Sequence, residues 1–178
     1  YSIDIPASDL SGDLIFEASG GTYTDEVYKE SVTADTFSVY VAGGTLSSDS
    51  TVHATPSSTI ISNLVRSHNK TLTEAKAAFN SAFGYTPDHS VEPVDATFSN
   101  ATSASNASQL AGIREASLSK LASNLNGGTL LSSDFGAFIA ALVQDISDGT
   151  LDGADAAGNV TIAGTAVTLP LDIQNMFG

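Results

Sequence analysis

Polar and apolar residues alternate in the first third of the chain with the period of two that is typical of β-strands. The alternation covers residues 2–5 and 36–41, while residues 14–18 form a short apolar run and residues 50–54 supply a fourth candidate strand. Glycine-containing pairs, which favour turns, separate these segments. The pattern predicts a β module over residues 1–54, with too few strands for a complete sandwich.

The period then changes to about 3.6, which is typical of amphipathic helices. Thr55 followed by Pro56 predicts the start of a first helix. Thr71 and Glu74 have the spacing of a capping box, in which each side chain accepts a hydrogen bond from the other residue's backbone N–H. The second helix is predicted to end at Gly84.

Residues 85–100 contain two prolines and scattered acids without a sustained period, so we expect a long irregular connection along the surface. Two longer helices follow, at about 104–125 and from residue 132 or 133 to 148. The helices predicted within residues 55–148 together form a small four-helix bundle.

The C-terminal part of the chain again has the residue pattern of β-strands. Residues 159–163 and 166–171 flank a Gly164-Thr165 turn, which predicts a β-hairpin within residues 149–178. A two-stranded ribbon is marginal alone and needs another sheet. The predicted fold class is therefore α+β, with a β module, a helical region and a C-terminal β-hairpin.

Charge narrows the classes of partner. Twenty Asp and Glu residues stand against six Lys and Arg residues, which gives a net charge of -14. Nucleic acid and anionic membranes both demand a basic face, so neither is expected as a partner. The sequence has no run of about 20 apolar residues, so no membrane span is expected. An excess of acidic residues usually keeps a protein soluble, and the alternative is that these residues bind calcium or a cationic surface.

Composition also bears on localisation. Cysteine and tryptophan are absent, Lys and Arg are scarce, and Ser, Thr, Gly and Ala are abundant, a profile common in secreted bacterial surface proteins. We expect an extracellular or cell-surface protein from which any signal peptide has been removed. Without cysteine, disulfides and thiol catalysis are excluded.

The opening stretch YSIDIPASDLSGDLIFEASGGTYTDE and the later stretch TVHATPSSTIISNLV resemble a repeating unit of bacterial surface lipoproteins and secreted proteins. That unit is an immunoglobulin-like, carboxypeptidase-regulatory-like module. Its pattern is Y-x-L-x-[IL]-P, an apolar strand, G-G-x-Y-x-D-E and a T-P-x-[ST]-T helix start. The likeness covers about the first 65 residues, and its motifs are structural, so it implies an architecture and not an activity.

In that family two or three strands precede the tyrosine of the opening strand, whereas here the sequence begins at Tyr1. The resemblance therefore implies an incomplete immunoglobulin-like β-sandwich, which exposes an apolar groove and unpaired strand edges. Either the chain's own residues 160–171 or a strand of a neighbouring copy would fill the groove. The residues expected to take part in assembly are Tyr1, Ile3, Ile5, Val160, Ile162, Val167, Leu169 and Leu171.

Exchange of a strand between copies joins two different surfaces of one molecule and propagates head to tail. The first hypothesis is therefore a structural subunit of an extracellular bacterial filament or matrix, a homo-oligomer assembled by strand complementation. The alternative is a monomeric binding module of a larger surface adhesin or lipoprotein, which recognises carbohydrate or protein through residues 85–100. Pairing of residues 160–171 within their own chain would favour the alternative.

Motifs for catalysis and metal binding are few. The chain has no Gly-x-Ser-x-Gly elbow, and its glycine pairs lack the lysine or third glycine of a phosphate loop, so we expect neither an enzyme nor an organic cofactor. The three histidines do not have zinc spacing. An acidic turn is a candidate calcium site, although its aspartates do not have the spacing of an EF-hand loop. The alternative is that these aspartates only hydrogen-bond the backbone of the turn. The candidate calcium ligands are Asp145, Asp148, Asp152 and Asp155.

Overall fold

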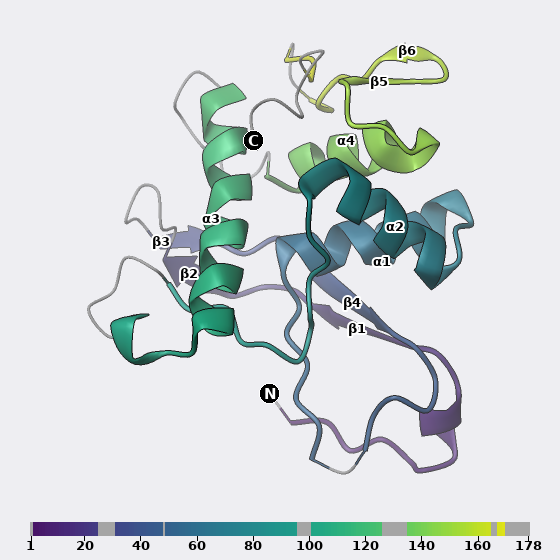
Figure 1. Ribbon diagram of the computed structural model, residues 1–178, viewed down its shortest axis with the longest axis vertical. Helices are drawn as coiled ribbons and strands as arrows, with labels where there is room; N and C mark the ends of the chain where they lie inside the picture. The colour runs from purple at the N-terminus through teal and green to yellow at the C-terminus, as the bar shows by residue number, and fades with distance from the viewer. Residues whose placement is uncertain are drawn as a thin grey trace.

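The computed structural model describes residues 2–24, 31–47, 49–95, 101–125, 135–164 and 167–169. Its architecture is α+β, with helices packed against small antiparallel sheets (Figure 1). The helices are α1 (Pro56–His68), α2 (Leu72–Phe83), α3 (Asn106–Leu125) and α4 (Phe135–Asp145). Short 3-10 helices are η1 (Asp9–Ser11), η2 (Ala101–Ser103) and η3 (Ile146–Asp148). The strands are β1 (Leu14–Ala18), β2 (Thr22–Thr24), β3 (Ser31–Thr33), β4 (Phe37–Val41), β5 (Ala154–Asp155) and β6 (Gly158–Asn159).

The predicted starts of the first two helices are confirmed. Thr55 accepts the Ser58 N–H, the Ser58 side chain accepts the Thr55 N–H, and Pro56 occupies the first turn of α1. Thr71 and Glu74 form the same reciprocal pair at the start of α2. These bonds satisfy N–H groups that have no partner within their helix.

Among the described residues, the sheets are three antiparallel pairs: β1 with β4, β2 with β3, and β5 with β6. In the first pair Leu14 lies opposite Val41, and the register continues without a break to the other end of both strands. The strands predicted at residues 14–18 and 36–41 are therefore confirmed. The described residues do not form a sandwich.

Residues 2–5 and 50–54 are not strands, so these two predictions are wrong. Alternation predicts which side chains share a face, but a strand also requires a hydrogen-bonded neighbour. In the second segment the His53 N–H donates instead to the His89 carbonyl oxygen, at 2.8 Å. This segment therefore lies against the irregular connection that follows α2.

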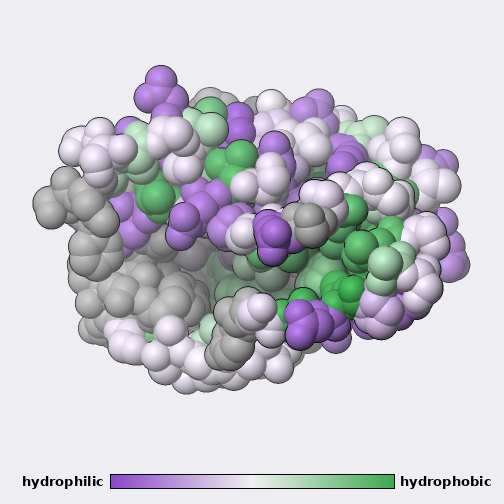
Figure 2. Space-filling view, turned by 90° about the horizontal axis from the view of Figure 1, so that it is seen from below, coloured by the Kyte–Doolittle hydropathy of each residue, from purple (hydrophilic) through white to green (hydrophobic). Residues whose placement is uncertain are grey.

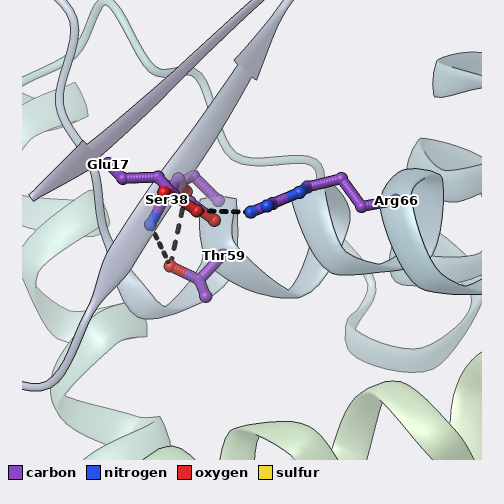
Figure 3. Close-up of polar contacts among 5 residues, drawn as sticks. Glu17, Ser38, Thr59 and Arg66 are labelled. Atoms are coloured by element: carbon purple, nitrogen blue, oxygen red, sulfur yellow. Dashed lines mark hydrogen bonds and ion pairs between the residues drawn. The ribbon is translucent and has the colours of Figure 1, made fainter.

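Helix α1 bonds to the outer edge of β4 at Ser38. Antiparallel partners alternate between hydrogen-bonded and non-bonded pairs, so every second residue of β4 directs its N–H and C=O away from β1. The Ser38 N–H donates to Thr59 Oγ1 at 2.8 Å (Figure 3). Ser58 Oγ donates to the Ser38 carbonyl oxygen at 2.8 Å. Arg66 of α1 forms an ion pair with Glu17 of β1 across the same interface (Figure 3). The hydroxyls of the T-P-x-[ST]-T motif thus attach the helix to the sheet.

One hydrophobic core joins the helices to the C-terminal part of the chain. Leu64 of α1, Phe79 of α2 and Leu142 of α4 are fully buried in it. Helix α1 lies centrally, with β4 on one side and α2 and α4 beside it (Figure 1). None of the helices in the described ranges is both long and apolar enough to cross a membrane.

The C-terminal hairpin pairs with itself where the structure describes it. The Ile162 N–H donates to the Val167 carbonyl oxygen at 2.9 Å, and the Leu169 N–H donates to the Val160 carbonyl oxygen at 2.8 Å. This pairing confirms the predicted hairpin over the described residues. Val160, Ile162 and Leu169 are at most 5% exposed and pack into the helical core of their own chain.

Candidate binding site

A cavity of about 230 Å³ lies between α3 and residues 85–93, which we call the connection. The sequence predicted no regular structure for this segment. Apolar atoms make up most of the cavity surface, and polar or charged side chains alternate with apolar ones around the lining. The lining residues are His53, Thr55, Ser58, Tyr85, Thr86, Pro87, Asp88, His89, Val91, Pro93, Ala107, Leu110, Ala111, Arg114 and Glu115.

A glycine in the middle of α3 lets the chain pass directly over the helix. A Cβ atom at Gly112 would lie 1.7 Å from the Val94 carbonyl oxygen. The Val94 N–H also donates to the Ser108 carbonyl oxygen, at 3.3 Å. One wall of the cavity is therefore fixed where Val94, directly after the connection, meets α3.

Hydrogen bonds also hold the other side of the cavity. Besides the backbone bond between His53 and His89, the Asp88 carboxylate accepts the Ser90 N–H at 2.9 Å and the Ser90 hydroxyl at 2.7 Å. The bonds from Ser90 lower the pKa of Asp88, so its carboxylate is ionised at neutral pH. Burial lowers the pKa of His89, so its imidazole is neutral at pH 7.

Tyr85 is held by contacts with three side chains. Its hydroxyl lies 2.9 Å from Ser57 Oγ, and its ring packs edge-on against Phe79 with ring centroids 5.1 Å apart. The guanidinium carbon of Arg114 lies 4.1 Å from the ring centroid, within the range of a cation–π interaction. Burial raises the pKa of Tyr85, so its hydroxyl stays protonated and can donate a hydrogen bond.

Glu115 joins α3 to the start of α1. Its Oε2 accepts the Ser57 N–H at 3.1 Å. The first N–H groups of a helix lack partners within the helix, and a carboxylate is favoured there by the helix dipole. Ser57 therefore bonds Glu115 through its backbone and Tyr85 through its hydroxyl, which ties α1, α3 and the connection together.

A second hollow, of about 640 Å³, lies at the N-terminal end of the molecule. Figure 2 views this end, and hydrophobic side chains gather in a depression on it. Ile3, which lines this N-terminal hollow, is 69% exposed. The lining residues are Ser2, Ile3, Asp4, Ile5, Leu10, Phe16, Leu46, Ser47, Asp49, Ser50, Thr51 and Val52.

Among the described residues, no strand pairs with the outer edge of β1, which lies beside the N-terminal hollow and which we call its free edge. Because Ser38 directs its polar backbone groups towards α1, its partner Glu17 directs its own away from β4. Alternation gives Ile15 the same orientation, and its side chain is 42% exposed. In the described part of the chain, no strand other than β4 pairs with β1. Phe16, between these two residues, lines the N-terminal hollow.

The four aspartates predicted as calcium ligands bond to nearby backbone. Asp145 accepts the N–H groups of Asp152 and Gly153, at 3.2 and 3.0 Å. Asp148, Asp152 and Asp155 each accept an N–H group from two residues further along the chain. Within the described ranges, no three such side chains form a group that could hold a metal ion. This geometry is that of acidic turns, and it gives the calcium prediction no support.

The residues predicted for assembly lie in two separate parts of the molecule. Ile3 and Ile5 line the N-terminal hollow. The C-terminal members lie in the helical core or pack against it: Val160, Ile162, Val167 and Leu169. Tyr1 and Leu171 lie outside the described residues. The structure does not bring the two described groups together.

The sequence did not predict how the cavity is assembled. The spacing of the three histidines gave them no common site, whereas the structure brings His53 and His89 into one lining. Tyr85 and Arg114 were not singled out, because no spacing rule relates residues from separate elements. The isolated glycine at position 112, inside a helical pattern, is the signal that indicates a close backbone approach.

No family model, curated protein or solved structure matches this chain. The cavity and the free edge of β1 are therefore the observations from which a function can be argued.

Proposed function

We propose that this chain is an extracellular binding module and that the cavity between α3 and the connection is its ligand site. The cavity itself is the observation that carries this proposal. Ligand sites are mostly apolar hollows with a few placed polar groups, and they are largely formed before the ligand arrives. The bonds among Ser57, Tyr85 and Glu115 form such a site in advance.

The ligand is small, of the size of one unit of a carbohydrate or of a protein chain. A volume of about 230 Å³ lies below the roughly 300–1,000 Å³ that drug-sized ligands occupy. The described part of the C-terminal hairpin pairs within its own chain, which supports a module that does not need to exchange this segment. The composition of the chain supports a location outside the cell.

Two leucine-sized residues of α3 provide matched variants for the test. Leu110 and Ile113 are similarly exposed, at 46% and 51%, but only Leu110 lines the cavity. Saccharides and peptides would be screened by chemical shift changes in the isotope-labelled chain. We expect a ligand to shift the amide signals of residues 85–93. The Leu110→Asp substitution should abolish these shift changes, and Ile113→Asp should preserve them. Binding that Leu110→Asp leaves unchanged would contradict the assignment.

The free edge of β1 favours a second function, that of a structural subunit of an extracellular filament or matrix. In this hypothesis β1 and β4 are part of an immunoglobulin-like sheet, and a strand from another copy adds at β1. Residues 2–5 have the alternation of a donor strand, and Ile3 is exposed. Because donor and acceptor are different surfaces, the copies would join head to tail.

Ile15 offers a test of the filament. Its N–H points away from β4, so Ile15→Pro removes a donor from the free edge without removing a β1–β4 hydrogen bond. Ile15→Thr, which keeps the N–H, is the control. The hypothesis predicts fibres of the wild-type chain and of Ile15→Thr in electron microscopy, and none of Ile15→Pro. A wild-type chain that sediments as a monomer at high concentration would rule the filament out.

A further inference from the structure

Arg114 is a cation in the cavity lining that forms no ion pair with a carboxylate of the described residues. The chain has six Lys and Arg residues against twenty Asp and Glu, so acids to pair with it are abundant. Within the described part of the chain, however, the ion pair that forms is that of Arg66 with Glu17, and the Arg114 guanidinium has neither an ion pair nor a hydrogen bond. Its five N–H donors therefore remain available to a ligand.

Tyr85 holds this guanidinium in position. The guanidinium stacks on the tyrosine ring at 4.1 Å, and the ring is itself fixed by the Ser57 hydroxyl and by Phe79. A planar guanidinium matches a carboxylate with two parallel hydrogen bonds, and a fixed one loses little side-chain entropy when it binds. Arg114 therefore has the geometry of an anchor for a carboxylate.

The rest of the lining determines what the carboxylate is attached to. Pro87, Val91 and Leu110 supply apolar surface. Asp88 and Glu115 carry negative charge in the same lining, and the chain as a whole has a net charge of -14, so a second negative charge on the ligand is repelled. The complement of this lining is a molecule with one carboxylate and an apolar body.

We propose that the cavity binds a small monocarboxylate with an apolar body, whose carboxylate lies on Arg114. This inference rests on the binding function proposed above and names the ligand class of the same site. The cation–π contact with Tyr85 places the charge, and the apolar side chains of the connection and α3 cover the body of the ligand.

Hexanoate and benzoate are suitable probes for the intact chain. Hexanamide is the neutral match of hexanoate, and glucuronate carries the same carboxylate on a polar body. In titrations followed by amide chemical shifts, hexanoate and benzoate should shift the signals of residues 85–93 and of α3. Because the charged hydrogen bonds are lost, the affinity for hexanamide should be lower than that for hexanoate by a factor of roughly ten or more. Glucuronate should also bind more weakly, since its body cannot replace water on the apolar lining.

Lys120 provides the matched control variant. It is an exposed residue of α3 outside the cavity lining, so Lys120→Gln and Arg114→Gln remove the same charge from the same helix. Arg114→Gln should weaken hexanoate binding roughly tenfold or more, to the level of hexanamide. Lys120→Gln should leave the affinity unchanged. Arg114→Lys keeps the charge without the planar fork and should retain part of the preference for hexanoate over hexanamide.

The outcomes separate the ligand class from the binding function. Equal binding of hexanoate and hexanamide, unchanged binding by Arg114→Gln, or no binding of either carboxylate would overturn the monocarboxylate assignment. A neutral saccharide or peptide that binds in a Leu110-dependent way would at the same time preserve the binding module. If Arg114→Gln loses its native amide spectrum, Arg114→Lys takes its place in the comparison. A wild-type chain that does not bind hexanoate more tightly than hexanamide would again overturn the assignment.

Discussion

Asp145 shows what burial does to a single residue. Its carboxylate is buried at the end of α4, where it accepts the N–H groups of Asp152 and Gly153. Burial raises the pKa of Asp145 from 3.8 to about 6, because the loss of water disfavours the charged form more than the two hydrogen bonds favour it. The turn after η3 therefore depends on a group that titrates close to neutral pH.

We expect Asp145 to make the free energy of unfolding depend on pH. The folded pKa lies above the unfolded one, so the contribution of this group is largest below about pH 4 and is lost as the pH rises through about 6. His89, whose pKa is lowered, acts in the opposite direction near the same pH, so the wild type must be compared with Asp145→Asn. In urea unfolding, the stability of wild type relative to the variant should be lower at about pH 7.5 than at about pH 5. The same difference at both pH values would contradict this assignment.

Ser62 of α1 is a buried residue with an unsatisfied group. Its side-chain oxygen is fully buried and has no hydrogen-bond partner. Ser62→Ala should therefore raise the free energy of unfolding by about 1 kcal/mol, measured by urea unfolding. Ser57→Ala is the control and should lower it, since the Ser57 hydroxyl bonds Tyr85. A destabilised Ser62→Ala variant would show that the hydroxyl has a partner.

At the scale of elements, Gly112 controls how closely the chain lies on α3. Gly112→Ala places a Cβ 1.7 Å from the Val94 carbonyl oxygen, so one of the two segments must move. We expect a loss of about 1–3 kcal/mol from overpacking, which outweighs the gain in helix propensity of about 1 kcal/mol. Amide shifts of residues 85–93 should change with it.

The exposed Ser117 on the same helix gives a control for that variant. Ser117→Ala should change the free energy of unfolding by no more than about 0.5 kcal/mol. If Gly112→Ala is as stable as Ser117→Ala and leaves the amide shifts of residues 85–93 in place, the chain does not approach Gly112 closely at Val94.

The elements that the sequence predicts well are those with local signals. Thr71 and Glu74 define the start of α2 within four consecutive residues, and Gly84, with a φ angle of 73°, ends it. Residues 2–5 have an equally clear alternation, but a strand depends on a partner elsewhere in the chain. The cavity is harder still, since Tyr85 and Arg114 come from separate elements and meet only through tertiary packing.

At the scale of the whole molecule, bonds join the segments predicted as a β module and a helical region. The carboxylate of Asp35, between β3 and β4, accepts the N–H of Gly136 in α4 at 2.8 Å. A Cβ atom at position 136 would lie 2.6 Å from Asp35 Oδ2, so only glycine fits without movement. The Ser38 backbone bonds to Thr59 in the same way across the two segments. Both contacts link residues that are distant in sequence, which is why the pattern of the sequence did not predict them.

Leu169 tests whether the C-terminal hairpin belongs to its own core. It is 2% exposed in the hydrophobic cluster, so Leu169→Ala should lower the free energy of unfolding by about 2–5 kcal/mol. Ile3→Ala, at a side chain that is 69% exposed, should have little effect in the monomer. Urea unfolding at several protein concentrations distinguishes the hypotheses. A loss that grows with protein concentration would show that Leu169 packs against another copy, contrary to the structure.

In the filament hypothesis, the two hydroxyls that bond the Ser38 backbone would give the sheet a direction of growth. Ser58 and Thr59 occupy the outer edge of β4 at Ser38, so a guest strand would add beyond β1, one for each molecule. A fibre built in this way would be unbranched and would have two unlike ends. Replacing both hydroxyls, with Ser58→Ala and Thr59→Val, would free this edge of β4, and irregular aggregates instead of single fibres would be the visible result.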